Sequence, residues 1–171
     1  LMRFYPLLLC LLFACSELDS PTPTTLRLAV LPDQSEATLR TRYAPLLQHL
    51  HQQTGLNLQL VVPTSYADML ARFEAGEIDI AKFGGLTFLQ SHVRENAQPL
   101  VMRQADSRFT SWFLVRSDDP AKTVADLQGY SFSFGSELST SGHLMPRHFI
   151  QKDMQLIPER HFSSVFYSGA H

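Results

Sequence analysis

The 171-residue chain has only two cysteines, Cys10 and Cys15, and both lie near its first residue. The rest of the sequence therefore has no disulfide, no thiolate nucleophile and no cysteine ligand for a metal. Basic clusters are missing as well: charged residues make up 18% of the chain, the formal net charge is −2, and no block of lysine and arginine occurs. These features argue against a protein that binds nucleic acid. Metal binding is not indicated either, because His143 and His148 have no third ligand at a suitable spacing.

The first residues have the composition of a bacterial export signal. A short basic start precedes an almost wholly apolar run over residues 4–14, which is too short to span a bilayer. The run ends in Leu12-Phe13-Ala14-Cys15, which resembles the bacterial lipobox, whose cysteine receives a lipid. We therefore expect a lipoprotein signal peptide over residues 1–14, lipidation of Cys15 and a tether over residues 15–25. A plain secretory signal cleaved at the same junction is the alternative.

From residue 26 onward, β and α patterns alternate, and the hydrophobic content of 44% is enough for a globular core. Strands are expected at 26–31, 58–62, 78–81, 100–102, 112–115, 130–134 and 162–167. Helices are expected between 39 and 55, from 65 to 76, from 86 to 93, over 124–127 and from 144 onward. Strands separated by helices of this length predict a parallel sheet covered on both faces. Ligands of such sheets bind at the carboxyl ends of the strands.

One junction between a strand and a helix carries three hydroxyls and a glycine, in Ser139-Thr140-Ser141-Gly142. A helical apolar pattern follows it, formed by Leu144, Met145, His148 and Phe149. The first N–H groups of a helix have no partner and carry a partial positive charge, so this junction could cradle an anion. Gly142 would let an oxyanion approach the backbone closely. An ordinary serine-capped helix start is the alternative, and the pattern by itself leaves both open.

Eight short motifs follow one another along the chain. They are Leu28-x-Val-Leu-Pro32, Tyr43-x-Pro45, Tyr66, Gly76-Glu-Ile-Asp79-Ile-Ala, Val115-Arg-Ser-Asp118, Asp126-Leu-Gln-Gly129, Ser139-Thr-Ser-Gly142-x-Leu-x-Pro146 and Tyr167-Ser-Gly-Ala-His171. In this order, they resemble the motifs of the phosphonate-, phosphite- and phosphate-binding proteins of bacterial ABC importers. The resemblance runs from about residue 26 to the last residue and favours the anion cradle.

The resemblance implies an α/β fold of two lobes, the periplasmic binding protein fold, which closes on an oxyanion. Lobe one is expected over residues 26–111 and is largely present. A hinge strand is expected over residues 112–117, with Trp112 at its start. Residues 118–171 then form an incomplete lobe two, whose sheet has exposed edges.

The family's ligand contacts can be carried over residue by residue. They map onto Ser139, Thr140, Ser141, Gly142, Tyr66 and His171. Tyr66 could instead staple the start of its helix to the core. The family's second tyrosine falls at Phe109, which has no hydroxyl, and Phe109 is expected in the core or the cleft wall.

The implied function is that of a solute-binding lipoprotein. It would capture a phosphonate, phosphite or phosphate for an ABC permease, on the periplasmic or extracytoplasmic face of a bacterial membrane and without a cofactor. An enzyme is not indicated, because no acid is placed to orient His171 beside a serine and no Gly-x-Ser-x-Gly elbow occurs. The alternatives are the ligand-sensing domain of a signalling system and a non-functional truncated fragment.

Overall fold

The computed structural model describes residues 25–169. The expected signal peptide, Cys15 and most of the tether lie outside the described residues, and so does His171. The helices and strands follow in the order β1 (Thr25–Val30), α1 (Glu36–Thr54), β2 (Asn57–Val61), α2 (Tyr66–Glu74), β3 (Ile80–Lys82), α3 (Gly85–Glu95), η1 (Gln104–Arg108), η2 (Ala125–Leu127), β4 (Ser131–Phe134), η3 (Thr140–Leu144), α4 (Met145–Lys152), α5 (Pro158–His161) and β5 (Ser164–Tyr167).

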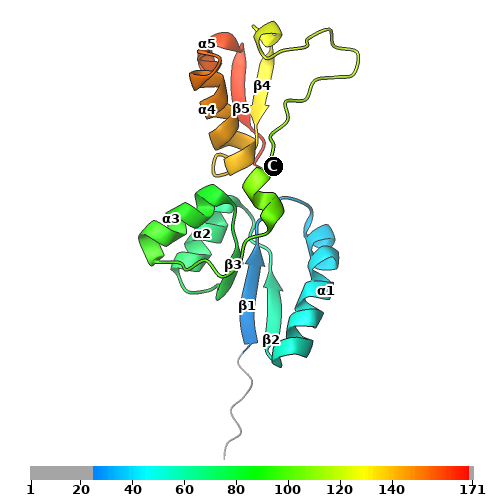
Figure 1. Cartoon of the computed structure of the whole chain (residues 1–171), viewed down its shortest axis with the longest axis vertical. Coiled ribbons are helices and arrows are strands. Elements are labelled where there is room, and N and C mark those ends of the chain that lie inside the picture. The colour runs from blue at the N-terminus through cyan, green and yellow to red at the C-terminus, as the bar shows by residue number, and fades with distance from the viewer. Residues whose placement is uncertain (1–24, 170–171) are drawn as a thin grey trace, which may run out of the picture.

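Lobe one comprises the elements from β1 to α3. Its three strands form a parallel sheet in the order β2-β1-β3, as the alternating pattern predicts. Helix α1 lies on one side of this sheet and helices α2 and α3 lie on the other (Figure 1). The strands and helices expected between residues 26 and 95 are confirmed, with bounds that differ by one to three residues at most ends.

The alternation of side chains along β1 explains why both faces of this sheet are covered. Leu28 and Val30 belong to one buried cluster, which the apolar side of α1 packs against. Ala29 and Leu31 belong to a second cluster, together with residues of α2. Successive residues of a strand point to opposite faces, so one short apolar strand supplies both cores.

Lobe two comprises the elements from η2 to β5. Strands β4 and β5 are parallel and pair with each other, and with no other strand among residues 25–169. A separate core lies here, built from Val124, Leu127, Phe134, Ile150 and Phe162. This lobe therefore has a hydrophobic core of its own, but a sheet of only two described strands.

Helix α4 buries Pro146 and Ile150, and Ile150 belongs to this core. Leu144, Met145 and Phe149, which form most of the apolar pattern in the sequence, are between 42% and 51% exposed. Pro146 and Ile150 are four residues apart and so lie on one side of a helix. The apolar pattern therefore predicted the helix but did not indicate which of its faces is buried.

The strands expected at residues 100–102 and 112–115 are absent, so the hinge segment is not a strand. Their side chains are largely exposed: Val101 is 90% exposed, Trp112 81% and Leu114 89%. An apolar run becomes a strand only beside a neighbour that completes its ladder of hydrogen bonds. No such neighbour lies beside these residues in the described part of the chain.

The two lobes lie one above the other along the long axis of the molecule (Figure 1). The connections that follow the carboxyl ends of β3 and β4 meet where the lobes touch, because α3 contacts η3 there. Across residues 25–169, no helix has both the length and the apolar character needed to cross a membrane.

Candidate functional site

The hydroxyl-rich junction after β4 folds into a tight turn at the start of a helix. Ser139 is the N-cap, and its Oγ accepts a hydrogen bond from the N–H of Gly142 at 2.9 Å. The first turn is a π-helix, in which the N–H of Leu144 donates to the carbonyl of Ser139 at 3.0 Å. The serine-cap interpretation is therefore right for Ser139. Single π-helical turns often occur at functional sites, so the cap does not exclude a binding role.

Gly142 is required by close packing inside this turn. A Cβ atom at this position would lie 3.0 Å from Ser139 Oγ and 3.2 Å from the Cα of Gly135. The same two glycines are joined by a hydrogen bond from the N–H of Gly135 to the carbonyl of Gly142, at 2.8 Å. A side chain at position 142 would therefore disturb the serine cap and push the turn away from the end of β4.

Each of the three residues Ser139, Thr140 and Ser141 of the cradle forms a hydrogen bond with a residue outside lobe two. The side chains of Ser139 and Tyr66 share a hydrogen bond. Thr140 Oγ1 accepts a hydrogen bond from the N–H of Leu86, the second residue of α3, at 2.7 Å. Ser111 Oγ donates to the carbonyl of Ser141 at 2.7 Å. The cradle thus lies at the boundary between the lobes.

Tyr66 has the anchoring role that the sequence left open, and its role as a ligand contact stays a prediction. Its side chain is 2% exposed and belongs to a core cluster with Met69 and Ile78, so it anchors the start of α2. Its hydroxyl also reaches Ser139 across the boundary. Burial raises the pKa of the Tyr66 phenol, and the nearby Asp33 carboxylate adds to this effect. Tyr66 therefore remains a neutral hydrogen-bond donor at physiological pH.

Several donors of the cradle remain for a ligand. The N–H groups of Thr140 and Ser141 occupy the first two positions of the helix, where no acceptor within the helix exists. The Ser141 hydroxyl has no hydrogen-bond partner among residues 25–169. Unpaired N–H groups at a helix start, next to a hydroxyl, suit an oxyanion. This arrangement can bind an anion without a charged side chain.

Other residues that the sequence singled out lie elsewhere. Phe109 is 68% exposed, so it does not lie in the core, which was one of its two expected places. His143 packs edge-on against the rings of Phe134 and Tyr167, and its Nδ1 lies 2.8 Å from the carbonyl of Glu137. His143 is thus a packing residue of lobe two.

The sequence interpretation missed two of the three partners of the cradle, Leu86 and Ser111. Ser111 lies in an irregular segment, which no periodic pattern marks. A signal for Leu86 existed, since the pair Gly84-Gly85 stands just before it at the carboxyl end of a strand. Two glycines at such a place indicate a close approach by another part of the chain.

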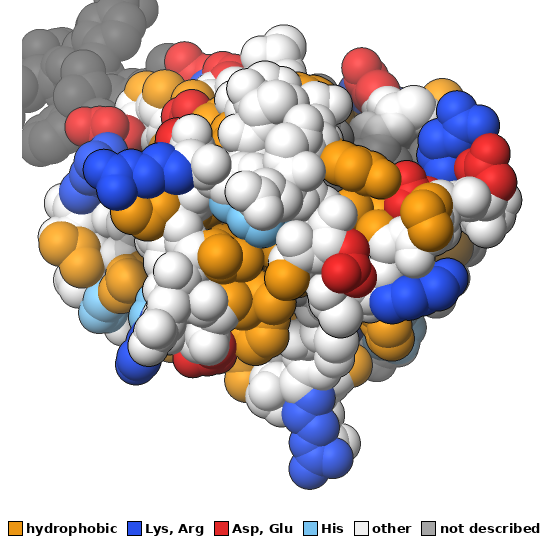
Figure 2. Space-filling view, turned by 90° about the horizontal axis from the view of Figure 1, so that it is seen from above, with side chains coloured by type: hydrophobic (Ala, Val, Ile, Leu, Met, Phe, Trp, Pro, Cys, Tyr) orange, Lys and Arg blue, Asp and Glu red, His pale blue; other side chains and the backbone are white. Residues whose placement is uncertain are grey.

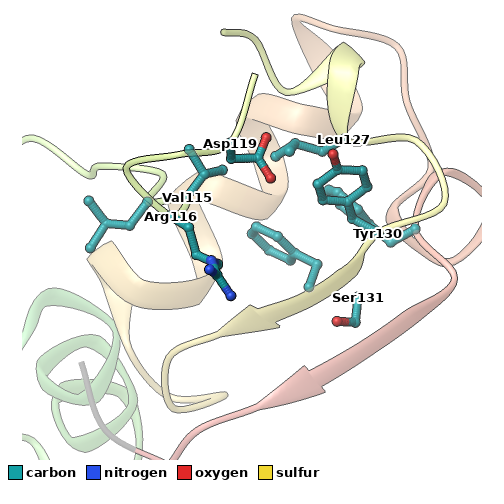
Figure 3. A pocket seen from close by; sticks show the side chains of 9 residues that line it. Val115, Arg116, Asp119, Leu127, Tyr130 and Ser131 are labelled. Atoms are coloured by element: carbon teal, nitrogen blue, oxygen red, sulfur yellow. The ribbon is translucent and has the colours of Figure 1, made fainter. Parts of the chain in front are cut away.

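A hollow of about 520 Å³ lies at the other end of β4 (Figure 3). Arg116 and Asp119 of the extended segment line it together with Tyr130 and Ser131 at the start of the strand. The cradle instead follows the carboxyl end of β4, where ligands of parallel sheets bind. The hollow is therefore separate from the candidate anion site.

Comparison with known proteins gives a consistent result. Residues 28–171 match the family described as the periplasmic substrate-binding protein of phosphonate ABC transporters. The chain is 27% identical over 156 residues to a probable phosphite-binding protein of an ABC transporter, PhnD1, from Prochlorococcus marinus, and the match covers 87% of this chain and 52% of the relative. It is 31% identical over 146 residues to the phosphate-import protein PhnD of Mycolicibacterium smegmatis, covering 78% of this chain and 46% of that protein.

A solved structure supports the fold. The structure of PhnD1 from Prochlorococcus marinus in complex with methylphosphonate aligns with a TM-score of 0.70 and 23% identity, over 88% of this chain and 58% of that one. The chain spans about half the length of the relatives that it matches in sequence. Its two-lobed α/β architecture is that of the periplasmic binding proteins, with incomplete lobes. The chain belongs to the family of periplasmic phosphonate-binding proteins of ABC transporters.

Proposed function

We propose that this protein captures a phosphorus oxyanion, namely a phosphonate, phosphite or phosphate, and delivers it to an ABC permease. The observation that carries the proposal is the cradle, in which the N–H groups of Thr140 and Ser141 and the Ser141 hydroxyl have no partner among residues 25–169 and lie where the lobes meet. The ligands named for the relatives, phosphite, phosphate and methylphosphonate, are all phosphorus oxyanions. Binding and release need no bond-making chemistry, so the role is not enzymatic.

The proposed contacts are hydrogen bonds from neutral donors. Ser139, Thr140 and Ser141 would supply hydroxyls or amides, Gly142 would allow close approach of the backbone, and Tyr66 would donate from lobe one. His171 would close the site from the end of β5. Residues 112–117 would act as the hinge, since the chain passes there from one lobe to the other without regular structure.

The test of the cradle is a calorimetric titration of methylphosphonate, phosphite, phosphate and sulfate into wild type and Ser141→Ala. A hydrogen bond to a charged group contributes about 1.5–3 kcal/mol, so losing this hydroxyl should weaken binding roughly ten- to hundredfold. Ser131→Ala is the matched control, because Ser131 is an exposed serine at the opposite end of β4. The proposal fails if wild type binds no phosphorus oxyanion better than millimolar, or if Ser141→Ala binds as tightly as the control.

We also propose that Cys15 carries a lipid anchor, which would keep the protein beside its permease on the extracytoplasmic face of the membrane. The support is the lipobox-like Leu12-Phe13-Ala14-Cys15 after an apolar run. The mature protein should then partition into detergent and carry added mass of diacylglyceryl size. Cys15→Ala should abolish both properties. A Cys15→Ala protein that is processed and retained at the membrane like wild type would show that the anchor lies elsewhere.

A further inference from the structure

Helix α3 of lobe one has no capping side chain of its own. Its N-cap is Gly84, which lacks a side chain, and the Thr87 hydroxyl bonds the N–H and carbonyl of Gly84. The N–H of Leu86, at the second position of the helix, still needs an acceptor. The acceptor is Oγ1 of Thr140 in lobe two, 54 residues further along the chain, at 2.7 Å from the Leu86 nitrogen.

We propose that Thr140 is a positioning residue that couples anion binding to the closure of the two lobes. This inference rests on the proposed function. A threonine hydroxyl has one proton and two lone pairs, so it can accept a bond and donate another at once. The hydrogen bond from the Leu86 N–H occupies one lone pair of the Thr140 hydroxyl. The hydroxyl proton can then be donated to an oxyanion that the same turn binds. The Thr140 hydroxyl then forms one hydrogen bond with the ligand and another with Leu86 of lobe one.

This double role makes the closed form more stable when the anion is bound. When the lobes separate, the Leu86 N–H loses its capping acceptor and the Thr140 hydroxyl loses its fixed orientation. An anion that holds the hydroxyl in place favours the closed form, because it binds that form better than the open one. The bond therefore contributes to affinity through the closure of the lobes as well as through direct contact.

Gly85 makes room for this contact. A Cβ atom at position 85 would lie 3.3 Å from Thr140 Oγ1 and 3.5 Å from its Cγ2. At the neighbouring Gly84 the closest atom would be 3.6 Å away, which is ordinary van der Waals contact. Gly85→Ala should therefore displace the Thr140 side chain by a few tenths of an ångström and weaken its hydrogen bond to Leu86, whereas Gly84→Ala should leave it in place. Neither change removes a donor of the cradle.

The first test measures the affinity for methylphosphonate and the separation of the lobes by small-angle scattering, with and without this ligand. We expect Gly85→Ala to bind about tenfold more weakly and to close less completely, since about 1.4 kcal/mol is one decade of affinity. Gly84→Ala should stay within twofold of wild type. Thr140→Val should lose closure, and Thr140→Ser, which keeps the hydroxyl, should restore it. A Gly85→Ala protein that binds and closes like wild type overturns the proposal.

The second test needs no ligand. Hydrogen exchange at the Leu86 amide should be faster in Thr140→Val than in wild type, and Thr140→Ser should return it to the wild-type rate. If no phosphorus oxyanion binds wild type, the proposed function fails, while the contact is still judged by this exchange rate. If Thr140→Val leaves the exchange at Leu86 unchanged, the coupling role of Thr140 is wrong whatever the ligand.

Discussion

In lobe one, the side chains of Arg27 and Asp79 join two segments that lie 52 residues apart in the sequence. The Asp79 carboxylate accepts hydrogen bonds from the backbone N–H of Arg27 at 2.7 Å and from its guanidinium at 2.9 and 3.0 Å. The same guanidinium donates to the carbonyl of Gly76 at 2.8 Å. These bonds tie the start of β1 to the turn that precedes β3. The hydrogen bonds from Arg27 hold the pKa of Asp79 at about 2, below its usual 3.8.

This lowered pKa predicts a pH-dependent contribution to stability. A carboxyl with a depressed pKa stabilises the fold above the pKa of the unfolded chain, near 3.8, and loses that effect as the pH falls through about 2. Asp79→Asn should therefore lower the urea midpoint at pH 7, and its difference from wild type should shrink between about pH 4 and pH 2. Glu74→Gln is the control, because Glu74 is exposed and has no ion pair among residues 25–169, and it should show no such trend. A difference that stays constant down to pH 2 would contradict the assignment.

Elements whose partners are local were predictable from the sequence. Ser35 and Ser65 cap α1 and α2, and Gly55 ends α1 in a left-handed conformation. Caps and apolar spacing are short-range signals, and they placed the strands and helices from β1 to α3 within a few residues of their bounds. The parallel pairing followed from the alternation of strands and helices.

Elements that depend on distant neighbours were not predictable. The run from Leu100 to Met102 looks like a strand, yet no strand among the described residues lies beside it. The first turn after Ser139 is a π-helix, whose spacing the usual helical periodicity does not mark. The hydroxyls of the cradle were visible in the sequence, but the bond between Thr140 and Leu86 depends on how two lobes meet. The sequence therefore indicated the residues of the candidate site, but not their partners Leu86 and Ser111.

The whole molecule exposes much apolar surface around the link, which is the segment between the end of α3 at Glu95 and the start of η2 at Ala125. Viewed from the end formed by lobe two, hydrophobic side chains gather in the middle of the surface (Figure 2). The largest exposed fractions lie in the link, at Val101, Trp112 and Leu114, and Phe166 of β5 is 52% exposed. Contiguous exposed apolar surface promotes association, and unpaired strand edges add to it.

This surface predicts that a protein of residues 26–171 self-associates through the link and the sheet of lobe two. Its apparent mass in light scattering should rise with concentration, and it should bind the dye ANS. Leu114→Lys places a charge in the middle of the link and should reduce both effects, because burying an unpaired charge in an apolar contact is unfavourable. Val93→Lys is the matched control, since Val93 is a 75% exposed residue on α3 in lobe one. If both lysine variants associate as wild type does, the contact does not involve the link. If wild type stays monomeric at all concentrations, the exposed side chains do not associate.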